Sequence, residues 1–175
     1  MDGNKRLTKI EGLPKSFWSA AHEFLRSLEE LKEVLEKEWA ALSKQDAATL
    51  LKINGEKQSR AGHVVDKRKE LHRTADAIVT AIGGRPGDDR WDYIKAAISA
   101  KQLHELETWI NGCKVLEMEI MAMNKRHLHW IDEQLETTRR LLDIFAGKVG
   151  MQGIVYDTHG KMRSDCGLNI RAAGF

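Results

Sequence analysis

The sequence predicts an all-α protein: an elongated antiparallel helical hairpin, extended by a long C-terminal helix into a three-helix coiled-coil bundle and followed by a flexible tail. Apolar residues recur at alternating steps of three and four, which is the period of one helix face. Proline occurs only at Pro14 and Pro86, both at predicted helix boundaries. We therefore expect an N-terminal arm (1–15), a helical domain (16–146) and a tail (147–175) that contains six glycines.

The first helix is expected to run from Ser16, a plausible N-cap after Pro14, to Leu42. Its predicted apolar stripe consists of Trp18, Ala21, Leu25, Leu28, Lys32, Leu35, Trp39 and Leu42. Acidic residues fill the positions between, and we expect these, including Glu30 and Glu38, to form a solvated face.

The second helix is expected to start at a cap on Asp46 and to reach Ile82. Because the connection is short, it should be an antiparallel neighbour of the first helix. Its stripe keeps the helical spacing but includes Lys57 and Arg68, so we expect a weaker, amphipathic seam. The segment 83–89 is rich in glycine and contains a proline, which predicts a turn.

The third helix is predicted to be the longest. Residues 91–98 read as a short helix or as its first turns, and Ser99 with Gln102 resembles a capping box. A helix over 101–146 would be about 70 Å long. Its heptad seam consists of Leu106, Trp109, Cys113, Leu116, Ile120, Met123, His127, Trp130, Gln134, Thr137, Leu141 and Ile144.

Composition excludes several classes of function. The 28 Lys and Arg nearly balance the 26 Asp and Glu, so a net charge of +2 gives no electrostatic reason to expect nucleic-acid binding. No segment approaches the roughly 18 to 20 apolar residues of a membrane span, and the chain start lacks the apolar core of a secretory signal. We expect a cytoplasmic protein that is not membrane-embedded. Cys113 and Cys166 lack a CxxC pattern, which favours free thiols.

No residue pattern predicts catalysis, and we expect no enzymatic activity, no cofactor and no metal site. His129 and Glu133 share a helix face, but two ligands are too few for zinc, so an exposed ion pair is the better interpretation. The glycine-rich turn follows no strand, which argues against a phosphate-binding loop. A histidine phosphotransfer domain using His63 is a remaining alternative, although no glycine follows in Val64-Val65-Asp66-Lys67.

Four motifs occur in order along the chain. They are the hairpin Leu35-Glu36-Lys37-Glu38-Trp39-Ala40-Ala41-Leu42 with Asp46-Ala47-Ala48-Thr49-Leu50-Leu51 and Glu56-Lys57-Gln58, then Trp91, then Asn111-Gly112, and finally Tyr156-Asp157-Thr158-His159-Gly160. Their order and spacing over about residues 20–165 resemble the FlgN family of flagellar export chaperones.

The resemblance implies a cytosolic chaperone of the flagellar type III secretion system. Family members bind C-terminal segments of the hook-filament junction proteins FlgK and FlgL, prevent their premature assembly and deliver them to the export gate protein FlhA. A third helix longer than the other two would leave its last turns uncovered, which suits helix-in-groove binding of cargo. The expected cargo-binding residues are Leu135, Leu141, Leu142, Phe145, Ile154 and Val155. Tyr156 matches the family's tail aromatic and is expected to dock on FlhA.

A coiled-coil adaptor or oligomerisation module is the alternative from a different class. Exposed heptad seams also drive self-association, and a homodimer is compatible with either function.

Overall fold

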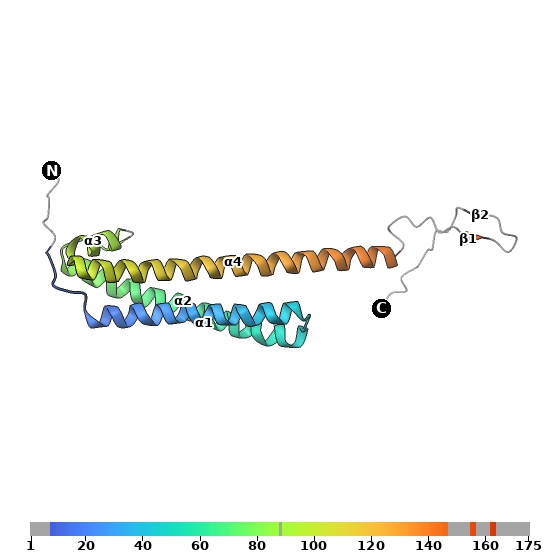
Figure 1. Cartoon of the computed structure of the whole chain (residues 1–175), viewed down its shortest axis with the longest axis horizontal. Helices are drawn as coiled ribbons and strands as arrows, with labels where there is room; N and C mark the ends of the chain where they lie inside the picture. Colours follow the sequence, from blue (N-terminus) through green and yellow to red (C-terminus); the bar gives the residue numbers. More distant parts are fainter. Residues whose placement is uncertain (1–7, 88, 147–154, 157–161, 164–175) are drawn as a thin grey trace, which may run out of the picture. The chain divides into compact units, whose positions relative to one another are not determined.

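The computed structural model describes residues 8–87 and 89–146, together with the backbone of residues 155–156 and 162–163. The elements are α1 (Lys15–Ser43), α2 (Ala47–Ala81), α3 (Arg90–Ala97), α4 (Ala100–Phe145), β1 (Val155–Tyr156) and β2 (Met162–Arg163) (Figure 1). The prediction of an all-α fold with a long C-terminal helix is confirmed. The chain divides into two compact units, residues 1–127 and 128–175.

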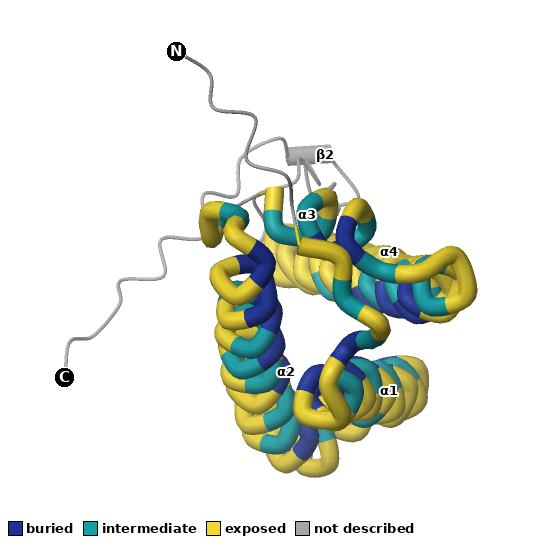
Figure 2. The backbone as a smooth tube through the Cα atoms, turned by 90° about the vertical axis from the view of Figure 1, so that its left-hand side faces the viewer, coloured by how far each residue is buried: buried dark blue, intermediate teal, exposed yellow. Residues whose placement is uncertain are grey.

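In the first unit, α1, α2 and α4 turn their buried residues toward one another (Figure 2). Ion pairs show that α1 and α2 are antiparallel, as predicted, because partners late in α1 are early in α2. Lys57 Nζ lies 2.8 Å from Glu38 Oε2, and Arg60 Nη1 lies 2.6 Å from Glu30 Oε2.

Helix α4 runs parallel to α1, since contacts advance in the same direction along both helices. The indole Nε1 of Trp109 donates a hydrogen bond to the carbonyl oxygen of Ala21 at 3.1 Å. Further along, Lys32 Nζ donates to Glu119 Oε2 at 2.9 Å, and this exposed hydrogen bond raises the pKa of Lys32. The buried residues of α4 are Leu106, Trp109, Cys113, Ile120 and His127, all of which belong to the predicted seam.

The start and the buried face of α1 differ from the prediction. The helix begins at Lys15 with Pro14 as its N-cap, so Ser16 lies in the first turn and its predicted capping role is wrong. Proline suits this position because its ring fixes φ, here at −61°, and its carbonyl oxygen accepts the backbone N–H of Trp18 at 3.3 Å. The buried face is centred on Phe17 and Phe24, whereas Trp18 from the predicted stripe is only half-buried. Because α1 packs against two helices, it buries a wider arc than one stripe describes.

Two acidic residues of the predicted solvated face are instead drawn into contacts between helices. Side-chain exposure is only 12% at Glu38 and 25% at Glu30. Both carboxylates meet basic side chains of α2. A partly buried carboxylate is tolerated because charged donors replace the water that it loses.

Glu38 also reaches α4. His127 Nδ1 lies 2.8 Å from Glu38 Oε2, and because an ionised carboxylate only accepts, Nδ1 carries the hydrogen. The His127 ring is 2% exposed and stacks on Trp39, with ring centroids 5.4 Å apart at 15°. Arg126 lies over the same indole, 4.2 Å from its centroid. His127 Nε2 is buried and has no hydrogen-bond partner among the described atoms. Glu38 therefore joins α1, α2 and α4 at one level.

The connections around α2 follow from local sequence. The predicted cap is confirmed, since Asp46 accepts the backbone N–H of Thr49 at 3.0 Å. At the other end Gly83 has φ +85°, which favours glycine, and Gly84 N donates to the carbonyl of Val79 at 2.9 Å. A Cβ at Gly84 would lie 2.8 Å from Val79 Cγ1. Ile98 is extended, so α3 is a separate helix, which settles the open assignment of 91–98.

Part of the predicted N-terminal arm is bonded to the ends of the helices. Ile10 N donates to the carbonyl oxygen of Ala97 at 3.0 Å, and Leu13 N donates to Gln102 Oε1 at 3.2 Å. The expected capping-box role of Gln102 is therefore wrong, because its carbonyl oxygen serves this tertiary contact.

The described part of the tail is a short strand pair that the sequence did not predict. β1 and β2 are antiparallel, with Val155 opposite Arg163 and Tyr156 opposite Met162. The other residues of the predicted flexible tail lie outside the described part of the chain.

Core burial is tested by Leu71→Ala. Leu71 is 2% exposed, and we expect the substitution to lower the free energy of unfolding by about 2–5 kcal/mol because it leaves a cavity. Urea unfolding followed by circular dichroism measures this. Leu51→Ala is the control on the same helix, because Leu51 is 78% exposed. It should change the free energy of unfolding by less than about 0.5 kcal/mol. Equal effects of the two substitutions would contradict the packing described.

The contacts of Glu38 with Lys57 and His127, which we call the Glu38 junction, are tested by Glu38→Ala. Removing the carboxylate leaves Lys57 and His127 Nδ1 without their acceptor, which should cost about 1–3 kcal/mol in the same measurement. Glu33→Ala is the matched control, because Glu33 is exposed on α1 and has no ion pair among the described residues. A cost at Glu38 no larger than at Glu33 would show that the junction contributes nothing.

Candidate functional site

The last part of α4, from Leu128 to Phe145, separates charged from uncharged residues around the helix. At 3.6 residues per turn each residue is rotated by about 100° from the one before it. The charged and histidine positions then fall within an arc of about 120°. They are His129, Asp132, Glu133, Glu136, Arg139, Arg140 and Asp143.

The remaining positions form an uncharged arc of about 200°, which we call the apolar arc. It consists of Leu128, Trp130, Ile131, Gln134, Leu135, Thr137, Thr138, Leu141, Leu142, Ile144 and Phe145. An apolar face this wide is typical of a helix that packs against another element along its whole length.

None of residues 128–145 is buried in the described structure. The side chains that the sequence predicted to bind cargo are exposed: Leu135 at 50%, Leu141 at 50%, Leu142 at 61% and Phe145 at 85%. The seam residues before them, such as Ile120 and His127, are buried. Large exposed apolar patches on a folded protein mark sites of interaction.

The apolar arc contains two rows of residues. The sequence predicted the first as a seam and, in the second, only Leu135 and Leu142 as individual cargo contacts. The predicted seam continues through Leu141 and Ile144. A second row at Leu128, Leu135 and Leu142 has a strict spacing of seven and begins directly after His127, the last buried residue of α4. The seven-residue spacing is visible in the sequence and could have identified this row. The two rows together make the arc wide enough for more than one line of contact.

The charged face of the same segment carries exposed ion pairs. His129 Nε2 lies 3.4 Å from Glu133 Oε1, a distance at which the two side chains form an ion pair when the imidazole is protonated. Arg140 Nε lies 2.9 Å from Glu136 Oε1. Pairs one helical turn apart add a few tenths of a kcal/mol to helix stability. They support the helix and leave its apolar arc free for contacts.

The predicted site residues in the tail are described only in part. Val155 and Tyr156 form β1, of which the backbone is described. Ile154 lies outside the described residues. The structure therefore brings together the four predicted residues of α4 and does not test those of the tail.

The described residues contain little that suggests chemistry. They include no group of three or more His, Cys, Asp or Glu that could hold a metal ion. Burial raises the pKa of the Cys113 thiol to about 12, which makes it a poor nucleophile at neutral pH. His63 is an exposed residue of α2. None of the helices in the described ranges is long and apolar enough to span a membrane.

Comparison with known proteins identifies one family. The sequence model of the family described as FlgN protein matches residues 19–164, a range that includes most of α1, all of α2, α3 and α4, and both strands. No curated protein and no solved structure gives a significant match.

Proposed function

Since the chain belongs to the FlgN family, which implies a role as a flagellar export chaperone, we propose that it binds the C-terminal segments of the hook-filament junction proteins FlgK and FlgL in the cytoplasm. It keeps these cargo proteins from assembling prematurely and delivers them to the export gate protein FlhA. The family is one of chaperones and not of enzymes. The observation that carries the proposal is the exposed apolar arc of α4.

The apolar arc suits an amphipathic cargo helix. The segment that carries it, Leu128 to Phe145, extends about 27 Å along the helix axis. A cargo helix laid along this length would bury apolar side chains of both partners, and each large side chain removed from water stabilises the complex by about 1.5–3 kcal/mol. Leu135 and Leu142 belong to the arc and are 50% and 61% exposed, so a partner could bury much of their surface. Helix-in-groove recognition works in this way.

The proposal extends to the tail through the residues that follow α4. Ile154 and Val155 are apolar, and in the proposal they add contacts to cargo beyond the end of the helix. Tyr156 is the proposed contact with FlhA. A tyrosine suits a docking contact because its ring contributes apolar area and its hydroxyl forms a hydrogen bond.

Cargo binding is tested by the double substitution Leu135→Glu with Leu142→Glu. Two carboxylates in the apolar arc would have to be desolvated on binding, so affinity for peptides of the FlgK and FlgL C-terminal segments should fall by at least about tenfold. Glutamate is a good helix former, so helicity should be retained. Isothermal titration calorimetry with the full chain measures the affinity, and circular dichroism measures the helicity.

The matched control adds the same charge elsewhere. Leu51 and Val65 are exposed on α2, and Leu51→Glu with Val65→Glu should leave cargo affinity unchanged. Cargo binding that is unaffected by the substitutions in the arc, or equally weakened by the control, would contradict the proposal.

The contact with FlhA is tested by Tyr156→Ala. Loss of the ring should weaken binding of the cargo-loaded chaperone to the cytoplasmic part of FlhA by at least about tenfold, since tyrosine is enriched among the interface residues that contribute most to binding. Tyr156→Phe retains the ring and separates its contribution from that of the hydroxyl group. Surface plasmon resonance measures both variants, and wild-type affinity in Tyr156→Ala would exclude Tyr156 as the docking residue.

Self-association is the competing use of the same apolar arc. Its rows with seven-residue spacing would also suit a second copy in a coiled coil, as an adaptor or oligomerisation module requires. Pull-down with isolated C-terminal peptides of FlgK and FlgL distinguishes the two functions. A chain that oligomerises through the arc and captures neither peptide would support the adaptor and not the chaperone.

A further inference from the structure

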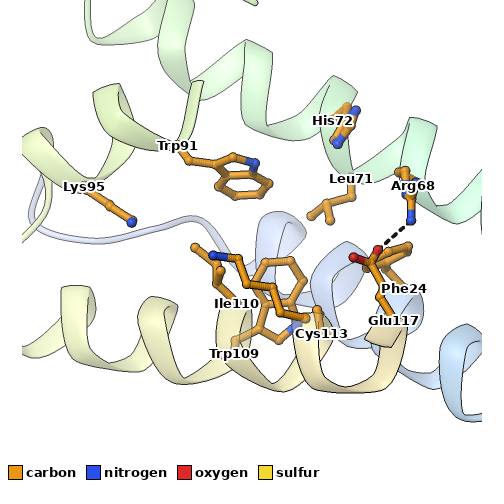
Figure 3. Close-up of a pocket in the computed structure, with 11 residues that line it drawn as sticks. Phe24, Arg68, Leu71, His72, Trp91, Lys95, Trp109, Ile110, Cys113 and Glu117 are labelled. Carbon is orange, nitrogen blue, oxygen red and sulfur yellow. Dashed lines mark hydrogen bonds and ion pairs between the residues drawn. The ribbon is translucent and has the colours of Figure 1, made fainter. Parts of the chain in front are cut away.

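The first unit contains a pocket of about 360 Å³ between α2, α3 and α4. This volume lies in the range of about 300–1,000 Å³ that is common for ligand-binding pockets. Leu71, Trp91, Trp109, Ile110 and Cys113 supply its apolar lining. Figure 3 shows Trp91 of α3 and Ile110 of α4 facing the same space from opposite sides. The pocket shares no residue with the apolar arc and does not depend on the proposed function.

The aromatic lining is held in place by residues beneath it. Phe17 is fully buried, and its ring centroid lies 6.2 Å from that of Trp91 and 6.3 Å from that of Trp109. The ring centroids of the two indoles lie 5.9 Å apart. Trp109 is fixed further by its hydrogen bond to the carbonyl oxygen of Ala21. A preformed pocket binds without the cost of ordering its own side chains.

An ion pair closes one end of the pocket. Arg68 Nη2 lies 2.5 Å from Glu117 Oε1, and the same guanidinium lies 5.5 Å from the ring centroid of Phe24. Figure 3 shows this pair on the side of the pocket opposite Lys95. Because Arg68 is already paired with Glu117, it lines the pocket and is not the expected partner of a ligand carboxylate.

The other charged residues at the pocket are two lysines. Lys95 of α3 and Lys114 of α4 line it, and neither pairs with a carboxylate within the described residues. His72 also lines the pocket, and burial, with Arg90 and Arg68 nearby, lowers the pKa of its imidazole. It is therefore neutral at pH 7. Around the pocket, Arg68, Lys95 and Lys114 carry positive charge and only Glu117 carries negative charge.

We propose that this pocket binds an acidic peptide segment of a partner protein. One large apolar or aromatic side chain of that segment enters the pocket and packs against its apolar lining, which includes Trp91 and Ile110. Carboxylates on its flanking residues pair with Lys95 and Lys114. The two lysines come from different helices, so they suit acids on both sides of the inserted side chain. A small anion alone would leave the apolar lining unfilled, which favours a peptide.

The charge of the chain's own terminal segments argues for an external partner. Residues 147–175 contain four Lys and Arg against two Asp, and residues 1–7 contain Lys5 and Arg6 against Asp2. Both segments are net basic and do not complement the lysines of the pocket. The expected occupant is therefore a segment of another protein.

The test uses the full chain and a synthetic probe, acetyl-Asp-Glu-Phe-Glu-Asp-amide, with binding followed by isothermal titration calorimetry and tryptophan fluorescence. We expect binding that weakens with rising salt, because ion pairs contribute to it. Two matched peptides separate the contributions: one has Ser in place of Phe, and one has Asn and Gln in place of the acids. Each of these two peptides should bind at least about tenfold more weakly than the probe.

Lys95→Glu with Lys114→Glu should weaken binding of the probe by about tenfold or more, since it places like charges opposite the acids. Lys52→Glu with Lys125→Glu introduces the same charge change at exposed residues outside the pocket and should leave binding unchanged. Should the first variant lose helicity, Lys95→Gln with Lys114→Gln removes the charges without reversing them and should still weaken binding.

Several results would overturn the proposal. The Ser peptide binding as tightly as the probe would show non-specific attraction between charges. Unchanged affinity in both lysine variants would place the probe elsewhere. Competition by a synthetic peptide of residues 147–175 would assign the pocket to the chain's own tail. A dimer that dissociates in Lys95→Glu with Lys114→Glu would assign it to a second copy.

Discussion

The packing of α1 against both α2 and α4 is the constraint on which the first unit depends. Ala21 and Val34 are both buried, although the helical spacing puts them about 140° apart around α1. An arc this wide cannot be covered by one neighbour, so the hairpin with α2 leaves apolar surface that α4 must cover. The indole of Trp109, bonded to the backbone of α1, connects the two parallel helices near one end.

The contacts of Glu38 close the same bundle at the other end. One carboxylate satisfies Lys57 of α2 and His127 of α4, so three helices are joined through a single side chain of α1. Such an arrangement contributes more to the pairing of specific helices than to overall stability, because the cost of removing charges from water offsets much of their attraction. Beyond His127 no described residue of α4 is buried, and the apolar arc begins.

The change at His127 links the fold to the proposed function. Before it, seam residues such as Leu106, Trp109 and Ile120 are buried, whereas after it the seam residues Leu141 and Ile144 are exposed. A helix gains little from an apolar arc of this width unless something covers it. Family membership implies an export chaperone, and the exposed arc is the surface on which the proposed cargo helix would lie.

Much of the fold could be predicted because it depends on local patterns. The cap at Asp46, the turn at Gly83 and the burial of the α4 seam follow from residue chemistry within one or two helical turns. Two of the predictions failed because the residue concerned bonds a partner far away in the sequence. Gln102 bonds Leu13 and not its own helix end, and Glu38 is drawn inward by residues of two other helices.

The same distinction applies to the binding surfaces. The segregation of charge over residues 128–145 depends only on helical spacing, and the sequence by itself determined which side chains lie on that arc. The tertiary structure alone decided that the seam is buried as far as His127, and that Trp91, Trp109 and Lys95 meet in one pocket. Helical periodicity specifies a face of each helix, whereas the neighbour of that face is set by competition among all the apolar surfaces of the chain.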